Sequence, residues 1–290
     1  MNAFRLLSMA AAALVTAACS NEQGEPETPK AHEPTAMRFA ATIGAPVGND
    51  ATRTEYDESS KGRIYVAWTI GDEVALIHNG VKDVVKVETV DDKGYATIAG
   101  NITTGTNGED VALVYPAAAV DANGSGTAFT PNADYAQKAL TQTGTLDYIA
   151  SYLDARQGSG TMAVSGSSAT LSDNVAMPSQ IAVWKLTPNV AATRLTVMSG
   201  GTPVAATATI AATNTIYLAL PPLADASLKI DVVSGSDTYT FSKEGVTLEA
   251  GKYYRSAVDM TVAGHNKIEI VEVGINDWTE GTTISGGQAM

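Results

Sequence analysis

The sequence predicts an all-β protein with two antiparallel β-sandwich domains, which follow a lipoprotein signal peptide and a flexible tether. Two observations predict this class. From Met37 onward, apolar and polar residues alternate with a period of two in short runs rich in Val, Ile, Thr and Tyr. Turn residues such as Asn79-Gly80 separate these runs. A spacing of about 8–12 residues between runs is typical of strands joined by hairpins.

Residues 1–18 are expected to be a signal peptide that is removed on export. Arg5 gives the segment a positive start, and a mainly apolar stretch follows up to Ala18. This stretch is shorter than the roughly 20 residues that a membrane-spanning helix needs. Two alanines directly precede Cys19, so we predict cleavage before Cys19 and acylation of its thiol. The alternative is an ordinary signal peptide followed by a cysteine that carries no lipid.

Cysteine usage supports lipidation. Cys19 is the only cysteine among 290 residues, so an exported chain has no partner for an internal disulfide. A lone free thiol in an oxidising compartment is a liability, whereas an acylated one is not. Each buried methylene of an acyl chain adds about 0.8 kcal/mol of membrane affinity. Two or three such chains would hold the protein at a membrane.

The charge balance disfavours nucleic acid as a partner. Removing residues 1–18 takes away Arg5, one of the 18 basic residues, and none of the 31 acidic ones. The net charge of −13 therefore becomes −14 in the mature chain. Such a surface repels phosphate backbones and anionic lipid headgroups.

Composition suggests where the domains begin and end. Residues 19–36 contain three prolines and four glutamates, so we expect a flexible tether. The predicted N-terminal sandwich spans 37–176, and the C-terminal sandwich spans 177–290. Within the first, residues 116–176 are interpreted as loop-rich decoration with weak helical signals at Asp134–Leu140 and Leu146–Arg156. One large sandwich with a long insertion is the alternative.

No pattern typical of catalysis or of a metal site occurs. The three histidines are far apart and lack neighbours at ligand spacing, and His78, next to a turn, is expected at the surface. No G-x-S-x-G, H-E-x-x-H or phosphate-binding glycine loop is found. We therefore expect no enzyme activity, cofactor or metal. Trp68, Trp184 and Trp278 are expected to pack in the core, although a sugar-binding platform is the alternative.

Several short motifs occur in an order that resembles the fimbrillins, the type V pilin class of Gram-negative anaerobes. The motifs are Cys19, Ala51-Thr52-Arg53-Thr54, Trp68-x-x-Gly71-Asp72, Asp147-Tyr148, Leu218-x-Leu220-Pro221-Pro222, Gly251-Lys252-Tyr253-Tyr254 and Asp277-Trp278. Each is weak alone, and their order along nearly all of the mature chain carries the resemblance. The family includes stalk, anchor and tip subunits, and the motifs leave the choice among them open.

The resemblance implies a fold, a location and a mode of assembly. Such pilins resemble two tandem transthyretin-like sandwiches, exported as lipoproteins to the outer membrane and exposed at the cell surface. A protease with arginine or trypsin-like specificity cuts the loop after the first strand, and a strand from another subunit fills the groove. The implied partners are other fimbrial subunits, in a homopolymer or a hetero-assembly, and a receptor on a host or bacterial surface.

In this chain, the first strand is the segment that such assembly would remove. Its residues on the inward face are Phe39, Ala41 and Ile43. A polar loop at residues 44–62 follows the strand and suits a protease. Arg53 lies within that loop and is the expected cleavage site, with Arg38 as the second candidate.

The C-terminal segment is the expected donor strand. Its apolar residues are Ile268, Ile270, Val273, Ile275 and Trp278. Burying four such side chains at about 1.5–3 kcal/mol each gives on the order of 10 kcal/mol before entropy is subtracted. The alternative is that this segment stays in the chain's own sandwich. The sequence thus predicts a structural subunit or accessory lipoprotein of a fimbria with a role in adhesion, and a monomeric glycan-binding surface lipoprotein is the alternative.

Overall fold

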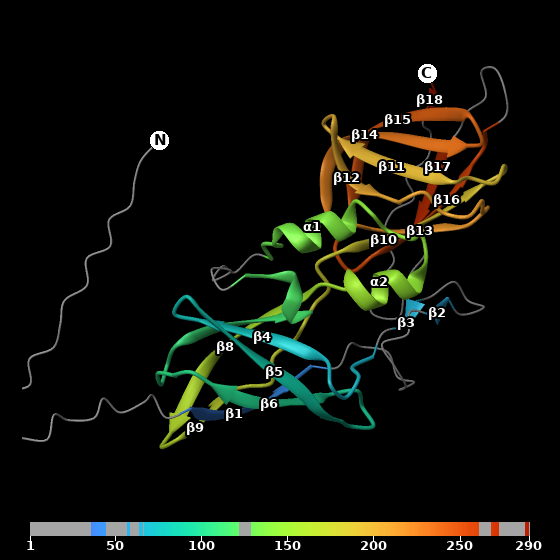
Figure 1. Ribbon diagram of the computed structural model, residues 1–290. Coiled ribbons are helices and arrows are strands. Elements are labelled where there is room, and N and C mark those ends of the chain that lie inside the picture. The colour runs from blue at the N-terminus through green and yellow to red at the C-terminus, as the bar shows by residue number, and fades with distance from the viewer. Residues whose placement is uncertain are drawn as a thin grey trace, which may run out of the picture. The chain divides into compact units, whose positions relative to one another are not determined.

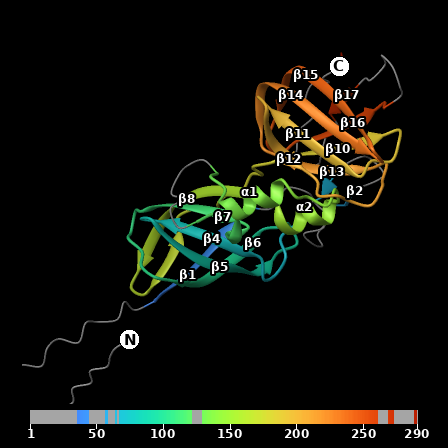
Figure 2. The same cartoon turned by 45° about the horizontal axis from the view of Figure 1, so that its top comes forward.

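The computed structural model describes residues 36–44, 57–58, 64–65, 67–121, 129–260, 268–272 and 288–289. The chain divides into two units, residues 1–33 and residues 34–290, and every described residue belongs to the second. Most of the described residues lie in β-strands, with two short α-helices between them (Figures 1 and 2). The predicted all-β class is confirmed.

The N-terminal strands close into a barrel in the order β1-β6-β5-β4-β7-β8-β9. These strands are β1 (Met37–Ile43), β4 (Glu73–His78), β5 (Val81–Val90), β6 (Ala96–Ile102), β7 (Asp110–Tyr115), β8 (Arg156–Ser165) and β9 (Ser168–Leu171). The prediction of an antiparallel sandwich is not confirmed here, because β1 and β9 pair in parallel and complete the barrel. Closure leaves neither the first nor the last strand as a free edge.

The turn chemistry of the first hairpin is as the sequence predicts. Asn79 and Gly80 join β4 to β5, and their φ angles are 44° and 73°. A two-residue hairpin loop needs positive φ at both central positions, which asparagine and glycine tolerate best. The two strands pair in register from Glu73 with Lys86 to His78 with Val81.

Strands β8 and β9 correct the interpretation of residues 116–176 as loop-rich decoration. Gly158 and Gly160 interrupt the apolar pattern of β8, yet they lie opposite interior residues of β7. A Cβ atom on Gly158 would stand 2.5 Å from Cγ1 of Val175. Glycine is needed there because another part of the chain packs directly against the strand. The helical signals are confirmed as α1 (Ala133–Ala139) and α2 (Leu146–Tyr152).

The C-terminal strands form two sheets that share one hydrophobic core. One sheet contains β13 (Ile216–Leu220), β10 (Ala182–Pro188), β16 (Tyr253–Val258) and β17 (Ile268–Glu272) in that order. The other contains β12 (Thr202–Ala206), β11 (Arg194–Ser199), β14 (Leu223–Ser234), β15 (Asp237–Leu248) and β18 (Gln288–Ala289). The parallel pairing of β10 with β16 departs from the antiparallel prediction. The transthyretin-like assignment and the boundary at residue 176 stay predictions.

The remaining described elements are short. They are β2 (Asp57–Glu58), β3 (Ile64–Tyr65) and the 3₁₀ helix η1 (Ala117–Ala119). Residues 67–69, which include Trp68, lie outside any strand.

Candidate functional site

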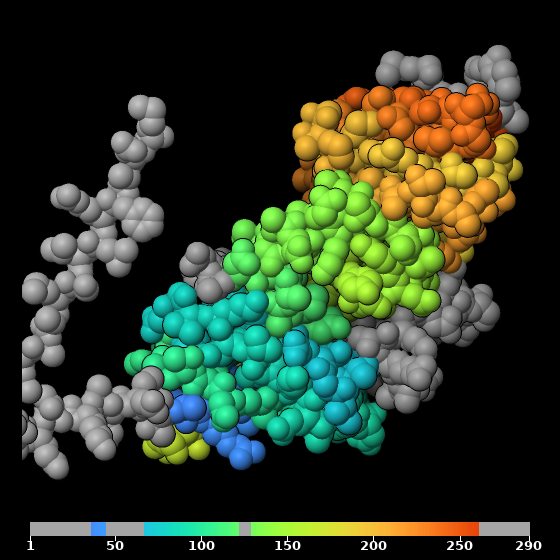
Figure 3. Space-filling model, in the orientation of Figure 1, coloured from blue at the N-terminus to red at the C-terminus, as the bar shows by residue number. Residues whose placement is uncertain are grey.

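The place that β1 occupies in the barrel is the candidate functional site. One edge of β1 pairs with β6 along its full length, from Met37 with Ile102 to Ile43 with Ala96. The other edge pairs with β9 over two residues and then with Val175 through an isolated bridge. Both edges of β1 are therefore hydrogen-bonded, and its outward atoms form a blue patch at the barrel surface (Figure 3).

The inward face of β1 belongs to the hydrophobic core of the barrel. Phe39 and Ile43 are 0% exposed, and Ala41 is 7% exposed. All three belong to the same buried cluster as Val74 and Leu76 of β4. The predicted alternation of inward and outward side chains along β1 is thus confirmed. The strand completes the core and does not merely cover it.

A second group of contacts fixes the end of β1. The indole Nε1 of Trp68 donates a hydrogen bond to the carbonyl of Gly44 at 3.0 Å. The amide of Gly44 donates in turn to the carbonyl of Val175. The Trp68 ring meets Tyr115 edge to face, with 5.2 Å between centroids, and the Tyr115 hydroxyl lies 3.5 Å from a carboxylate oxygen of Asp72. Trp68 therefore links the end of β1 to a polar group inside the barrel.

The barrel end at which β1 begins is closed by a polar cluster that the sequence did not reveal. His78 is 1% exposed, so the prediction that it lies at the surface is wrong. Its Nε2 lies 3.0 Å from Asp83, and its Nδ1 lies 3.3 Å from Glu109. Asp83 also accepts hydrogen bonds from the amide and hydroxyl of Thr103. Alternation along β4 places His78 on the same inner face as Val74 and Leu76.

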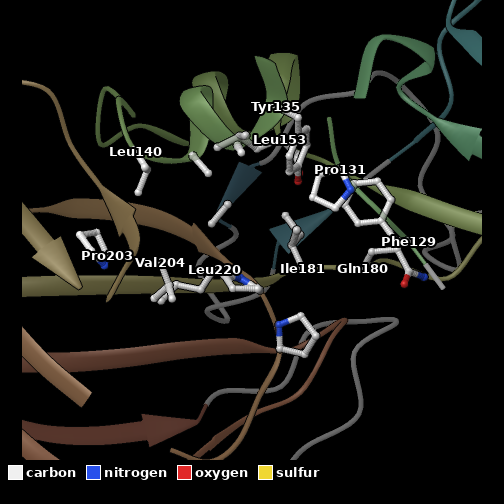
Figure 4. Close-up of a pocket in the computed structure, with 15 residues that line it drawn as sticks. Phe129, Pro131, Tyr135, Leu140, Leu153, Gln180, Ile181, Pro203, Val204 and Leu220 are labelled. Atoms are coloured by element: carbon white, nitrogen blue, oxygen red, sulfur yellow. The ribbon is translucent and has the colours of Figure 1, made fainter. Parts of the chain in front are cut away.

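An apolar cavity of about 440 Å³ lies near α1. Its lining includes Phe129, Tyr135, Leu153, Ile181, Val204 and Leu220, as Figure 4 shows. The Tyr135 hydroxyl is already used, since it donates to the carbonyl of Leu153 at 2.8 Å. The volume of the cavity is within the range of about 300–1,000 Å³ that is usual for ligand pockets. The Leu218–Pro222 motif and the helical signal at Asp134–Leu140 both contribute residues to this lining.

Comparison with known proteins gives structural neighbours only. No protein-family model matches the chain, and no curated protein matches its sequence. The chain is similar to a candidate cell adhesion protein from Bacteroides ovatus, with 16% identity and a TM-score of 0.42, over 85% of this chain and 99% of that one. It is similar to a fimbrial assembly protein from Parabacteroides distasonis, with 15% identity and a TM-score of 0.39, over 86% and 99%.

A third solved structure is the tip fimbrial protein Mfa3 from Porphyromonas gingivalis, with C-terminal truncation. Here the identity is 9% and the TM-score 0.36, over 82% of this chain and 98% of that one. The structures that this chain resembles are thus described as fimbrial proteins and candidate cell adhesion proteins.

The structure describes only some of the predicted site residues. Cys19 and Arg53 lie outside the described residues. Arg38 lies within β1, with an exposed side chain and an amide that donates to Ser167. Acylation and cleavage therefore stay predictions.

Of the predicted donor residues, the structure describes two and leaves three outside the described residues. Ile268 and Ile270 lie in β17, which pairs antiparallel with β16 of the chain's own sheet. Val273, Ile275 and Trp278 lie outside the described residues. Donation of this segment to a neighbour therefore stays a prediction.

Two further observations concern metals and membranes. Among the described residues, no group of three or more His, Cys, Asp or Glu side chains is placed to hold a metal ion. Within the same residues, no helix is both long and apolar enough to span a bilayer.

The carboxyl group of Asp72 gives the site a testable pH dependence. Burial is the largest influence and raises its pKa above the ordinary value, and the charge of Asp154 raises it further. Hydrogen bonds from the Thr69 amide and the Tyr115 hydroxyl oppose this shift. The folded state therefore holds the Asp72 proton more tightly than the unfolded state, so this group favours folding most below pH 3.8.

We expect Asp72→Asn to remove this contribution. As the pH rises from 3.8 through the raised pKa of Asp72, the wild type should lose stability relative to the variant. Urea unfolding at several pH values measures the difference. Glu73→Gln is the matched control, because its carboxylate is exposed and pairs with exposed Lys86 at 3.0 Å. A difference between wild type and Asp72→Asn that stays constant with pH would contradict this reading of the site.

Proposed function

We propose that the protein is a structural subunit or accessory lipoprotein of a bacterial surface fimbria, with a role in adhesion. We propose further that it assembles by strand exchange after a protease removes β1. The observation that carries this proposal is the position of β1. It is the first described strand of the chain, it completes the barrel core, and the expected cleavage site at Arg53 lies in the loop that follows it in sequence.

Loss of β1 would leave the barrel with two unsatisfied edges. The backbone groups of β6 and of the β9 segment would lose their partners, and the sites of Phe39 and Ile43 would be empty. Burial of each such side chain stabilises a protein by about 1.5–3 kcal/mol, so the open barrel has a strong tendency to accept another strand. An added strand satisfies the backbone and seats alternate side chains in the vacated sites.

The proposed anchor is a lipid on Cys19, joined to the barrel by the tether at residues 19–36. This arrangement would place the protein at the outer membrane with its folded part exposed. Proposed partners are other fimbrial subunits and a receptor on a host or bacterial surface. Cleavage at Arg53 would separate the folded body from both β1 and the lipid, which ties assembly to release from the membrane.

Replacing Arg53 tests the proposal directly. An arginine-specific protease should cut the mature wild-type chain once and early, giving an N-terminal fragment that ends at Arg53. We expect Arg53→Ala to abolish this cut. Arg38→Ala is the matched control and should be cut like the wild type, because the Arg38 backbone is paired within β1. Intact-mass spectrometry measures the fragments, and a first cut at Arg38 or at any arginine other than Arg53 would refute the assignment.

The alternative of a glycan-binding surface lipoprotein receives less support. Trp68 and Trp184 are 4% and 0% exposed, and the Trp184 indole donates to the hydroxyl of Ser256 at 2.8 Å. Neither ring is free to stack on a sugar. Among the described residues, the predicted core role of these two tryptophans is confirmed.

A further inference from the structure

The slot of β1 is defined here as the space and the two strand edges that β1 occupies, and it restricts side-chain size at three positions. We propose that a strand from a different protein, and not the C-terminal segment at residues 267–278 of a second copy of this chain, refills this slot. Read in the direction of β1, that strand carries a large apolar residue, a small residue and a branched apolar residue at alternate positions, followed directly by glycine. This inference rests on the strand exchange proposed above.

The first position is that of Phe39, which is fully buried. Phe39 lies opposite Gly100 in the β1–β6 register. A Cβ atom on Gly100 would stand 3.1 Å from Cγ1 of Val85, which is closer than ordinary van der Waals contact, so a side chain here would require Val85 to shift. The space is shaped for a large ring from the strand that fills the slot. A charged group there would be buried without a partner, which is strongly unfavourable.

The next positions require small residues. Ala41 is buried opposite Ile98 in the barrel core, where a larger side chain would overpack its neighbours. Gly44 follows the strand, and a Cβ atom there would lie 3.3 Å from the Cα atom of Ala176. That distance is shorter than ordinary van der Waals contact, and the obstructing atom is backbone. The slot therefore disfavours large residues at both positions.

The segment at residues 267–278 does not satisfy these requirements in any register. The slot needs three apolar or small residues at alternate positions. Within 267–278, one such set has no charged or amide side chain, and it consists of Val271, Val273 and Ile275. In either direction this register places Val273 at the site of Ala41. It also places Asn276 or Ile270 at the site of Gly44. Aligning Gly274 with Gly44 in the direction of β1 instead buries Glu269 at the site of Phe39.

The mismatch has a consequence for assembly. If the slot rejects the segment at residues 267–278 of an identical chain, the protein does not polymerise with itself by donating that segment to this slot. Its neighbour on this side is then another kind of subunit, and its own C-terminal segment serves a different recipient. The chain thus fits a hetero-assembly better than a homopolymer.

Peptide exchange tests this inference on the mature protein cut at Arg53. Labelled peptides with the sequences of residues 36–44 and of residues 267–278 are added, and fluorescence anisotropy measures their entry into the slot. We expect the 36–44 peptide to enter and the 267–278 peptide to bind at least about 100-fold more weakly, as expected for overpacking and poor complementarity. Binding of the two within tenfold would overturn the inference.

A redesigned peptide provides the converse test. The substitutions Val271→Phe, Val273→Ala and Asn276→Gly give the 267–278 peptide the required pattern, and we expect them to restore most of the lost affinity. No gain would also overturn the inference. Self-association of the cut chain into ladders without another subunit would do the same. If even the 36–44 peptide fails to enter, strand exchange itself is refuted, which is a distinct result.

Discussion

Replacing Phe39 by alanine is expected to destabilise the uncut protein by about 3–5 kcal/mol, the usual cost of truncating a buried phenylalanine. The ring is fully buried in the barrel core, opposite a glycine that contributes no side chain. Little nearby can therefore collapse into the space that the substitution leaves. Urea unfolding followed by tryptophan fluorescence measures the change. After cleavage, the shortened fragment should also dissociate faster than the wild-type fragment.

The neighbouring residue on the same strand provides the control. Ala40 also pairs with β6, opposite Ala99, but has an exposed side chain, so Ala40→Ser should change stability by less than about 0.5 kcal/mol. Equal effects of the two substitutions would show that β1 contributes backbone pairing alone. The slot would then have no side-chain selectivity, and both the core role of β1 and the proposed choice of partner would be wrong.

Local features of the fold could be predicted because their causes lie within a few residues. The alternation of residues 37–43 gives β1, and Asn79-Gly80 gives the first hairpin. Two weak helical signals correspond to α1 and α2, where Asn132 and Thr145 cap the first turns through their side-chain oxygens. Each of these signals is complete in the local sequence.

Features that depend on distant partners could not be predicted. Barrel closure joins β1 to β9, which are separated by more than a hundred residues, and a glycine-rich strand reads as loop until the packing against it is known. His78 resembles a surface residue in sequence, because its partners Asp83 and Glu109 are brought together only by the fold. Buried polar residues are the class that single-sequence patterns miss.

Gln142 is another buried polar residue, and its substitution is the second change for which we expect a large loss of stability. It is 0% exposed, and its side-chain amide mimics a strand beside β13. Its Oε1 accepts from the amide of Ala219 and its Nε2 donates to the carbonyl of the same residue, both at 2.9 Å. The Gln142 backbone pairs at the same time with Ala206 and Ala208 at the end of β12. One residue therefore protects an edge of each C-terminal sheet.

We expect Gln142→Ala to destabilise the protein by about 3–5 kcal/mol, because each buried group left without a partner costs about 1–3 kcal/mol. Gln142→Met keeps most of the volume but none of the hydrogen bonds, so it should recover only a minor part of the loss. Gln137→Ala, an exposed glutamine on α1, is the matched control and should change stability by less than about 0.5 kcal/mol. Urea unfolding measures all three. Full recovery by methionine would mean that packing, and not edge pairing, is the role of Gln142.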